Sequence, residues 1–125
     1  YRQFGNTATG TILLLKTMEQ YEENSVLESS AFFSFPPYDR TVYLDESAAE
    51  WIVENGFIVV GIDNFSVDAH SQTTVHSMLL GKGVFVVECL DLRAVEEGTY
   101  FFVCLPLKAV GCDGAPARAI LLTYP

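Results

Sequence analysis

His76 and Glu88 are the two side chains in this sequence whose types and placement could hold a metal ion. A neutral imidazole and a carboxylate are both ligands that Zn²⁺ and Mn²⁺ accept. Zinc normally takes three protein ligands in a catalytic site, so a complete centre would need further ligands from elsewhere. The sequence therefore offers part of a metal centre.

A simpler interpretation of the same two residues stays open. His76 could be a hydrogen-bonded helix residue, and Glu88 could be a charge at the end of a strand. Residue types and spacing alone favour this interpretation, because two ligands are too few to define a site.

Two predicted elements hold His76 in place. An apolar, strand-like run at 57–62 leads into a polar loop at 63–68. The segment that follows has apolar residues at helical spacing, namely Val75, Met78 and Leu79. The pattern predicts a strand, a loop and a helix that carries His76.

Glycines mark the end of this helix. Gly81 and Gly83 are expected to stop it, because glycine tolerates the left-handed conformation at a helix C-terminus. Residues 84–87 then predict a second buried strand that ends at Glu88. His76 and Glu88 are therefore expected on neighbouring elements, each near a polar end.

Polar residues of the loop before the helix fit capping and turn roles. Asp63, Ser66 and Asp68 lie where caps are expected, and Asp68 is predicted to be the N-cap of the His76 helix. Asp113 fits a turn-stabilising carboxylate, and His70 fits a surface residue near the helix start. No catalytic residue is assigned within this sequence.

The first half of the sequence predicts one strand–helix–strand crossover. Residues 11–16 form a β-rich apolar run. A helix at about 46–54 follows, with Asp45 as its N-cap and the Asn55-Gly56 pair as its end. The strand at 57–62 completes the crossover, a connection that favours parallel pairing.

The last third of the sequence is strand-rich. Residues 90–95 could form a short turn of helix, and 99–107 and 117–124 predict strands on either side of a tight loop at 111–116. The result is a mixed α/β fold with more strand than helix. No internal boundary is convincing, so residues 1–125 are predicted to be part of a single domain.

Charge and composition exclude several classes of partner. The net charge is −9 and the seven Lys and Arg residues are scattered, which argues against nucleic acid and disfavours anionic membranes. No apolar run approaches the roughly 20 residues of a spanning helix. The opening Tyr1-Arg2-Gln3 does not resemble a signal peptide, and a chain that begins at Tyr is expected to lack an upstream part.

Cysteine and serine chemistry finds little support. The three cysteines show no Cys-x-x-Cys spacing, which argues against a zinc cage or a disulfide framework. Cys89 and Cys104 lie in apolar strand-like runs and are expected to act as small hydrophobes. The sequence contains neither a Gly-x-Ser-x-Gly elbow nor a glycine-rich phosphate loop.

The order of residues resembles the C-terminal half of the cyclase family of metal-dependent hydrolases, whose members include kynurenine formamidase and isatin hydrolase. The resemblance covers most of the chain. It is carried by Leu13 to Thr17, Leu44 to Trp51, Gly61-Ile62-Asp63 with Ser66 and Asp68, His76 with Leu79-Leu80-Gly81, Glu88 with Leu90 and Leu92, Gly98-Thr99-Tyr100, Pro106-Leu107-Lys108 and Gly111 to Ala119.

The resemblance implies a fold, a chemistry and a cofactor. It implies the swivelling β/β/α architecture, incomplete in this chain, and hydrolysis of a small aryl formamide, amide or lactam of the kind met in tryptophan catabolism. It also implies a divalent metal, zinc or manganese, with His76 and Glu88 as ligands. The aromatic, proline-stiffened stretch at 32–38 could wall the substrate pocket, as the resemblance suggests, or could merely cover a core.

One departure from the family pattern shapes the functional prediction. Family enzymes carry an upstream His-x-Gly-Thr-His-x-Asp motif that supplies the other metal ligands, and this sequence has none. We therefore expect the C-terminal part of an amidohydrolase that needs an N-terminal half and is inactive alone. The alternative is a non-catalytic binding or structural protein that has lost the first metal motif.

The strands themselves predict a protein partner. The runs at 11–16, 57–62 and 99–107 are apolar on both faces, a pattern typical of strands covered on each side, and only two helices are available to cover them. We expect an apolar interface of more than about 1,000 Å² with the N-terminal half or with a second copy of the chain.

Overall fold

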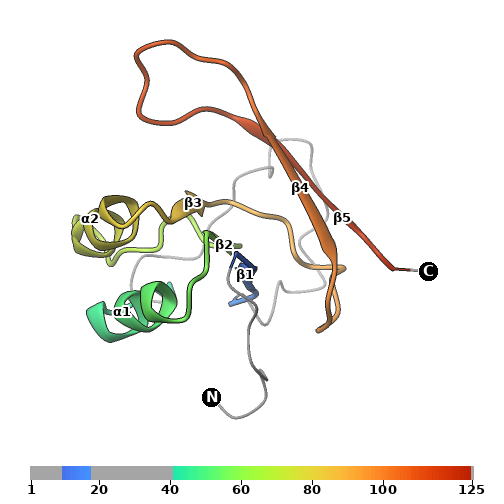
Figure 1. Cartoon of the computed structure of the whole chain (residues 1–125), viewed down its shortest axis with the longest axis horizontal. Coiled ribbons are helices and arrows are strands. Elements are labelled where there is room, and N and C mark those ends of the chain that lie inside the picture. The colour runs from blue at the N-terminus through green and yellow to red at the C-terminus, as the bar shows by residue number, and fades with distance from the viewer. Residues whose placement is uncertain (1–9, 18–40, 125) are drawn as a thin grey trace. The chain divides into compact units, whose positions relative to one another are not determined.

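The computed structural model describes residues 10–17 and 41–124 (Figure 1). Its elements in chain order are β1 (Ile12–Leu15), α1 (Glu46–Glu54), β2 (Val59–Ile62), α2 (Thr74–Gly81), β3 (Phe85–Val87), β4 (Phe101–Pro106) and β5 (Ala117–Leu122). The mixed α/β class predicted from the sequence is confirmed. The stretch at 32–38 lies outside the described residues.

The chain divides into two compact units with the boundary between Ala94 and Val95. The first unit holds the strands β1 to β3 and both helices, and the second holds the β4–β5 hairpin. Among the described helices none is long and apolar enough to cross a membrane. The prediction of a single domain stays a prediction.

The first unit is built on a parallel three-stranded sheet in the order β1-β2-β3. Leu14 pairs with Gly61 on one side, and Gly61 pairs with Val87 on the other. Parallel pairing through a helical crossover was the sequence prediction, and it is confirmed for β1–α1–β2. Because all three strands run in the same direction, their carboxyl ends meet at one edge of the sheet.

Helix α1 begins and ends where the sequence predicted. The Asp45 carboxylate accepts hydrogen bonds from the Ala48 amide at 2.8 Å and the Ser47 hydroxyl at 2.7 Å. These hydrogen bonds, the one from Ser47 first, lower the pKa of Asp45. Asn55 is the C-cap, and Gly56 follows with a φ of 74°, a left-handed conformation that glycine adopts without strain.

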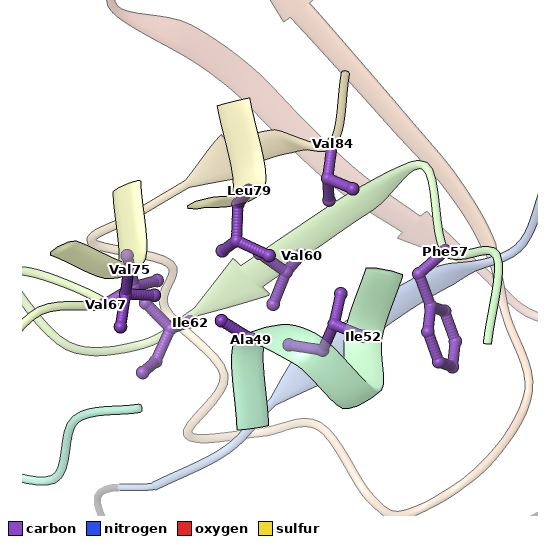
Figure 2. Close-up of a cluster of buried hydrophobic side chains, with 9 residues drawn as sticks. All are labelled: Ala49, Ile52, Phe57, Val60, Ile62, Val67, Val75, Leu79 and Val84. Carbon is purple, nitrogen blue, oxygen red and sulfur yellow. The ribbon is translucent and has the colours of Figure 1, made fainter. Parts of the chain in front are cut away.

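Both helices pack on the same face of β2 and form the core of the first unit. Figure 2 shows Ala49 and Ile52 of α1 and Leu79 of α2 pointing toward Val60 and Ile62 of β2. Four more buried residues complete the cluster: Phe57, Val67, Val75 and Val84. Burial of this apolar surface stabilises the placement of α2 over the sheet, and α2 is the element that carries His76.

The opposite face of β2 is covered by the chain that follows β3. A Cβ added at Gly61 would lie 2.6 Å from Leu14 Cδ2 and 2.7 Å from Leu90 Cδ1, so both leucine side chains would have to shift to admit a larger residue here. Leu90 and Leu92 are both buried.

This packing corrects one sequence prediction. Residues 90–95 form no turn of helix. The Leu90 amide donates to the Ile62 carbonyl at 3.1 Å, which holds the chain against β2. The Asp91 side chain accepts from Arg93 two residues later and closes a turn there. Tertiary contact with the sheet therefore decides the local conformation.

The second unit is an antiparallel hairpin of β4 and β5, as the two predicted strands imply. Phe101 pairs with Leu122, and Pro106 pairs with Ala117. The Leu107 amide donates to the Pro116 carbonyl at 2.9 Å, so the connection spans the residues between these two and is longer than the tight loop predicted at 111–116.

Replacement of Ile52 tests whether the core of Figure 2 holds the first unit together. Ile52 is 1% exposed, and Ile52→Ala should lower the free energy of unfolding by about 2–5 kcal/mol, because the cavity cannot fully collapse. Ile58 is 47% exposed, so Ile58→Ala is the matched control and should cost less than about 1 kcal/mol. Urea unfolding of both variants measures the difference, and equal losses would contradict this core.

Candidate metal centre

The polar residues of the first unit gather where the parallel strands end. Thr17 follows β1, the loop 63–68 follows β2, and Glu88 follows β3. Ligands of open α/β sheets usually bind outside the carboxyl ends of the strands. The edge is thus the expected location of a site.

Asp63 fixes the first two of these segments to each other. Its buried carboxylate accepts from the Thr17 amide at 2.9 and 3.0 Å and from the Thr17 hydroxyl at 2.6 Å. The Asn64 side chain next to it donates to the Val42 carbonyl at 2.7 Å. These contacts give both residues a structural role and keep the loop after β2 in one position.

His76 and Glu88 lie side by side, which confirms that the two predicted ligands occupy neighbouring elements. The distance between His76 Nε2 and Glu88 Oε1 is 3.3 Å. The His76 side chain is 28% exposed and that of Glu88 is 26% exposed, so solvent or a ligand can reach both. The pair comes from the first turn of α2 and the residue after β3.

A backbone amide of the β2 loop holds the Glu88 carboxylate. The Val67 N–H donates to Glu88 Oε1 at 2.8 Å, and the Val67 carbonyl accepts from the Leu44 amide. The oxygen nearest His76 is therefore the one that the loop positions. The loop after β2 thus determines where Glu88 can reach.

Asp68 is a residue whose main contact the sequence did not predict. Its carboxylate accepts from the Val75 amide at 2.7 Å and the His76 amide at 3.0 Å, so it does cap α2. The N-cap position itself belongs to Thr73, whose side chain makes no capping hydrogen bond. Asp68 therefore caps the helix from a loop position further upstream than the N-cap that was predicted for it.

The same carboxylate also contacts the ring of His76. Asp68 Oδ2 lies 2.6 Å from His76 Nδ1, and the Asp68 side chain is only 1% exposed. Burial raises the pKa of Asp68, but hydrogen bonds from His76 and Val75 outweigh burial and hold the pKa of this carboxyl below its usual value. Asp68 is therefore ionised at neutral pH and faces His76 from the side opposite Glu88. No spacing rule for helix caps indicates this ring contact.

Three other side chains, one histidine and two cysteines, are not assigned to this site. His70 is exposed, as expected for a surface residue. Cys89 was expected inside a strand, but it follows β3, is exposed and has a φ of 59°. Partial removal from water and then the Glu88 carboxylate raise the pKa of its thiol, which disfavours the reactive thiolate. Cys104 lies within β4, where the prediction placed it.

The His76–Glu88 pair fits two ligands of one ion. Zn–N and Zn–O bonds of about 2.1 Å at a tetrahedral angle separate two ligand atoms by about 3.4 Å. The observed 3.3 Å between Nε2 and Oε1 matches that separation. Within residues 10–17 and 41–124 no three His, Cys, Asp or Glu side chains are grouped to hold a metal.

Fold and site together define an α/β unit with a histidine and a glutamate in contact at the carboxyl edge of a parallel sheet. The family model described as "Putative cyclase" matches residues 1–69. The chain belongs to this cyclase family. The resemblance read from the sequence is thereby confirmed.

Sequence identity to named relatives agrees with this family assignment. The chain is 44% identical over 77 residues to cyclase-like protein 1 of Arabidopsis thaliana, covering 59% of this chain and 30% of the relative. It is 39% identical over 74 residues to kynurenine formamidase of Bordetella petrii, covering 58% of this chain and 35% of the relative. The chain thus spans about a third of these relatives.

Solved structures agree as well. A structure described as a predicted metal-dependent hydrolase from Bacillus stearothermophilus matches with a TM-score of 0.72 and 34% identity, over 92% of this chain and 51% of the other. One described as a potential metal-dependent hydrolase with cyclase activity matches with a TM-score of 0.63 and 37% identity, over 68% of this chain and 43% of the other. The match to each is to about half of a longer chain.

Removal of the Asp68 carboxylate should destabilise the first unit. Asp68→Ala leaves two amides at the start of α2 without their acceptor, and the expected loss is about 1–3 kcal/mol of unfolding free energy. Asp91→Ala removes an exposed carboxylate whose hydrogen bonds go to Arg93 and should cost under about 0.5 kcal/mol. Urea unfolding at neutral pH compares the two, and similar losses would contradict the capping role.

Proposed function

We propose that this chain is part of a metal-dependent amidohydrolase in which His76 and Glu88 are metal ligands. The proposed substrate class is a small aryl formamide, amide or lactam, by analogy with the kynurenine formamidase among the relatives. The single observation that carries the proposal is the 3.3 Å approach of His76 Nε2 and Glu88 Oε1 at the carboxyl edge of the sheet.

The finer architecture follows the same reasoning. We infer that β1 to β3 with their two helices, together with the β4–β5 hairpin, are part of the swivelling β/β/α fold of the family. Support comes from the parallel sheet, the antiparallel hairpin and the match to about half of two longer structures. The remaining strands would belong to the rest of the protein.

The proposal assigns a task to His76, to Glu88 and to the groups that hold them. His76 and Glu88 would hold Zn²⁺ or Mn²⁺, which supplies a water of lowered pKa and polarises the substrate carbonyl. The Val67 amide keeps the Glu88 oxygen in place, and α2 keeps the imidazole at the edge of the sheet. No general base is assigned among the described residues, so the base and the remaining ligands would come from the N-terminal part.

The alternative function, a non-catalytic cyclase-like binding or structural protein, rests on a different observation. The sequence contains no His-x-Gly-Thr-His-x-Asp motif. In that case the His76–Glu88 contact would be a structural one that holds no metal. The sequence of the gene upstream of Tyr1 discriminates between the two functions: an intact motif favours the enzyme and a degraded one favours the alternative.

The enzyme proposal predicts loss of both metal and activity in a ligand variant. In the complete protein, His76→Ala should reduce amide hydrolysis at least about a hundredfold, because the metal contributes several kcal/mol of transition-state stabilisation. A chelator should have a comparable effect, and added Zn²⁺ or Mn²⁺ should restore the wild type only. Hydrolysis of an aryl formamide and metal content per chain are the measurements.

His70→Ala is the matched control for this experiment. It removes the other histidine of the sequence, which is exposed, and should keep both metal and activity. Activity that survives both chelation and His76→Ala would overturn the enzyme proposal.

A protein partner is a second part of the proposal, and the hairpin supports it. The face of β4 and β5 that carries Phe101 and Leu105 also carries Ile120 and Leu122, since cross-strand pairs project to the same side. These four side chains are 45–64% exposed. We propose that the N-terminal part of the protein covers this face, because the chain spans only about half of the solved structures that it matches.

Without that N-terminal part, the chain should self-associate through the exposed face at micromolar concentration. The double variant Leu105→Glu, Ile120→Glu places two carboxylates on the face and should reduce self-association at least about tenfold, since charge disfavours burial. Thr123→Glu adds a charge at an exposed position next to β5 and should have little effect. Sedimentation velocity is the measurement, and a well-folded wild-type monomer would contradict the partner proposal.

A further inference from the structure

We propose that Asp68 is a positioning residue that fixes the proton of the His76 ring on Nδ1 and so leaves the Nε2 lone pair directed at Glu88. The inference concerns the metal-free chain, and only its consequence for metal affinity rests on the proposed function. The observation behind it is that two carboxylates flank one imidazole, one at each nitrogen.

The two carboxylates compete for a single proton when the ring is neutral. Asp68 Oδ2 lies 2.6 Å from Nδ1, at the short end of charge-assisted hydrogen bonds. Glu88 Oε1 lies 3.3 Å from Nε2, beyond the usual range of about 2.7–3.2 Å for such a bond. Distance therefore favours the proton on the Asp68 side.

Burial favours the same side. The Asp68 side chain is 1% exposed, whereas that of Glu88 is 26% exposed and can be solvated. A buried carboxylate that lost its hydrogen bond to the ring would not be compensated by water, so the loss would carry the desolvation cost of a charged group. Glu88 in addition receives the Val67 amide at 2.8 Å, so it depends less on the ring.

The ring cannot easily turn away from this arrangement. Asp68 binds the His76 backbone amide at 3.0 Å and the Val75 amide at 2.7 Å, so the carboxylate is fixed relative to the first turn of α2. The Asp68 amide in turn donates to the Ser66 hydroxyl at 3.1 Å. One side chain thus sets both the start of the helix and the orientation of its imidazole.

The consequence is an imidazole with its free lone pair on the side of Glu88 before any ligand arrives. A metal that binds between Nε2 and Oε1 would need no tautomer change. Carboxylate partners of ligating histidines act in this way, and their loss typically lowers metal affinity about 10–100-fold. Asp68 would touch neither metal nor substrate, so its role is positioning.

Nitrogen-15 NMR of the histidine rings tests the tautomer directly in the metal-free chain that carries Leu105→Glu and Ile120→Glu, the two hairpin changes expected to reduce self-association. His70→Gln serves as the background, because the sequence contains only two histidines and the signals then belong to His76. At a pH where the ring is neutral we expect a protonated Nδ1 and an unprotonated Nε2. A protonated Nε2 in this chain, whose Asp68, His76 and Glu88 are all unchanged, would overturn the inference.

Asp68→Asn should shift the population toward protonated Nε2. An asparagine amide can donate to Nδ1, and Glu88 then attracts the proton to the other nitrogen. Glu88→Gln should leave Nδ1 protonated. Asp45→Asn is the matched control, because Asp45 also caps a helix with a carboxylate of lowered pKa but contacts no histidine. An unchanged tautomer in Asp68→Asn would contradict the positioning role.

Titration with Zn²⁺, followed by the His76 signals, separates this inference from the proposed function. Affinity in Asp68→Asn should fall about 10–100-fold relative to Asp45→Asn. Equal affinity in the two would overturn the positioning role. If Zn²⁺ leaves His76 unperturbed in every chain while the wild-type tautomer is as stated, the assignment of the proton stands, and the metal content of the complete protein and of its His76→Ala variant decides the metal proposal.

Discussion

The hydrogen bonds of the Asp68 carboxylate are the constraint on which the rest of the site depends. Two amides at the start of α2 donate to this one buried side chain, and Nδ1 of the His76 ring lies 2.6 Å from it. An ionised carboxylate is stable in such a position only when its oxygens are fully hydrogen-bonded. The loop, the helix start and the imidazole therefore form one cooperative unit.

The parallel sheet provides the frame for that unit. Because β1, β2 and β3 run in the same direction, the segments after all three strands come together, and Asp63 joins two of them through Thr17. The two helices pack on one face of β2 and Leu90 packs on the other, and together they hold the carboxyl end of β2 in place. Packing of the core and geometry of the site are thus parts of one arrangement.

Much of the first unit was predictable from local sequence signals. Asp45 and Gly56 delimit α1 through capping chemistry that acts over three or four residues, and glycines end α2 in the same way. The proximity of His76 and Glu88 followed from element order alone. These features depend on neighbours in sequence, which is why the sequence reveals them.

The failures concern contacts between segments distant in sequence. Residues 90–95 are not helical, because Leu90 packs against Gly61 and its amide donates a hydrogen bond to the Ile62 carbonyl. Local residue propensities do not predict such contacts. The contact of Asp68 with the ring was missed for a similar reason, since the loop conformation that brings it there is set by Ser66, Val67 and Leu44. Tertiary geometry decided both.

The chain has too few ligands for the proposed metal site, and it leaves one apolar face of the hairpin exposed. The proposed metal site has two ligands among the described residues, and zinc in a catalytic site takes three from protein. The hairpin offers an apolar face of four exposed large side chains, and a two-stranded sheet cannot bury both of its faces by itself. A single additional polypeptide could supply both the ligands and the cover. A protein that had lost its metal function would still need another polypeptide to cover this apolar face. The exposed face therefore supports a partner under either proposed function. Only the His76–Glu88 geometry bears on catalysis.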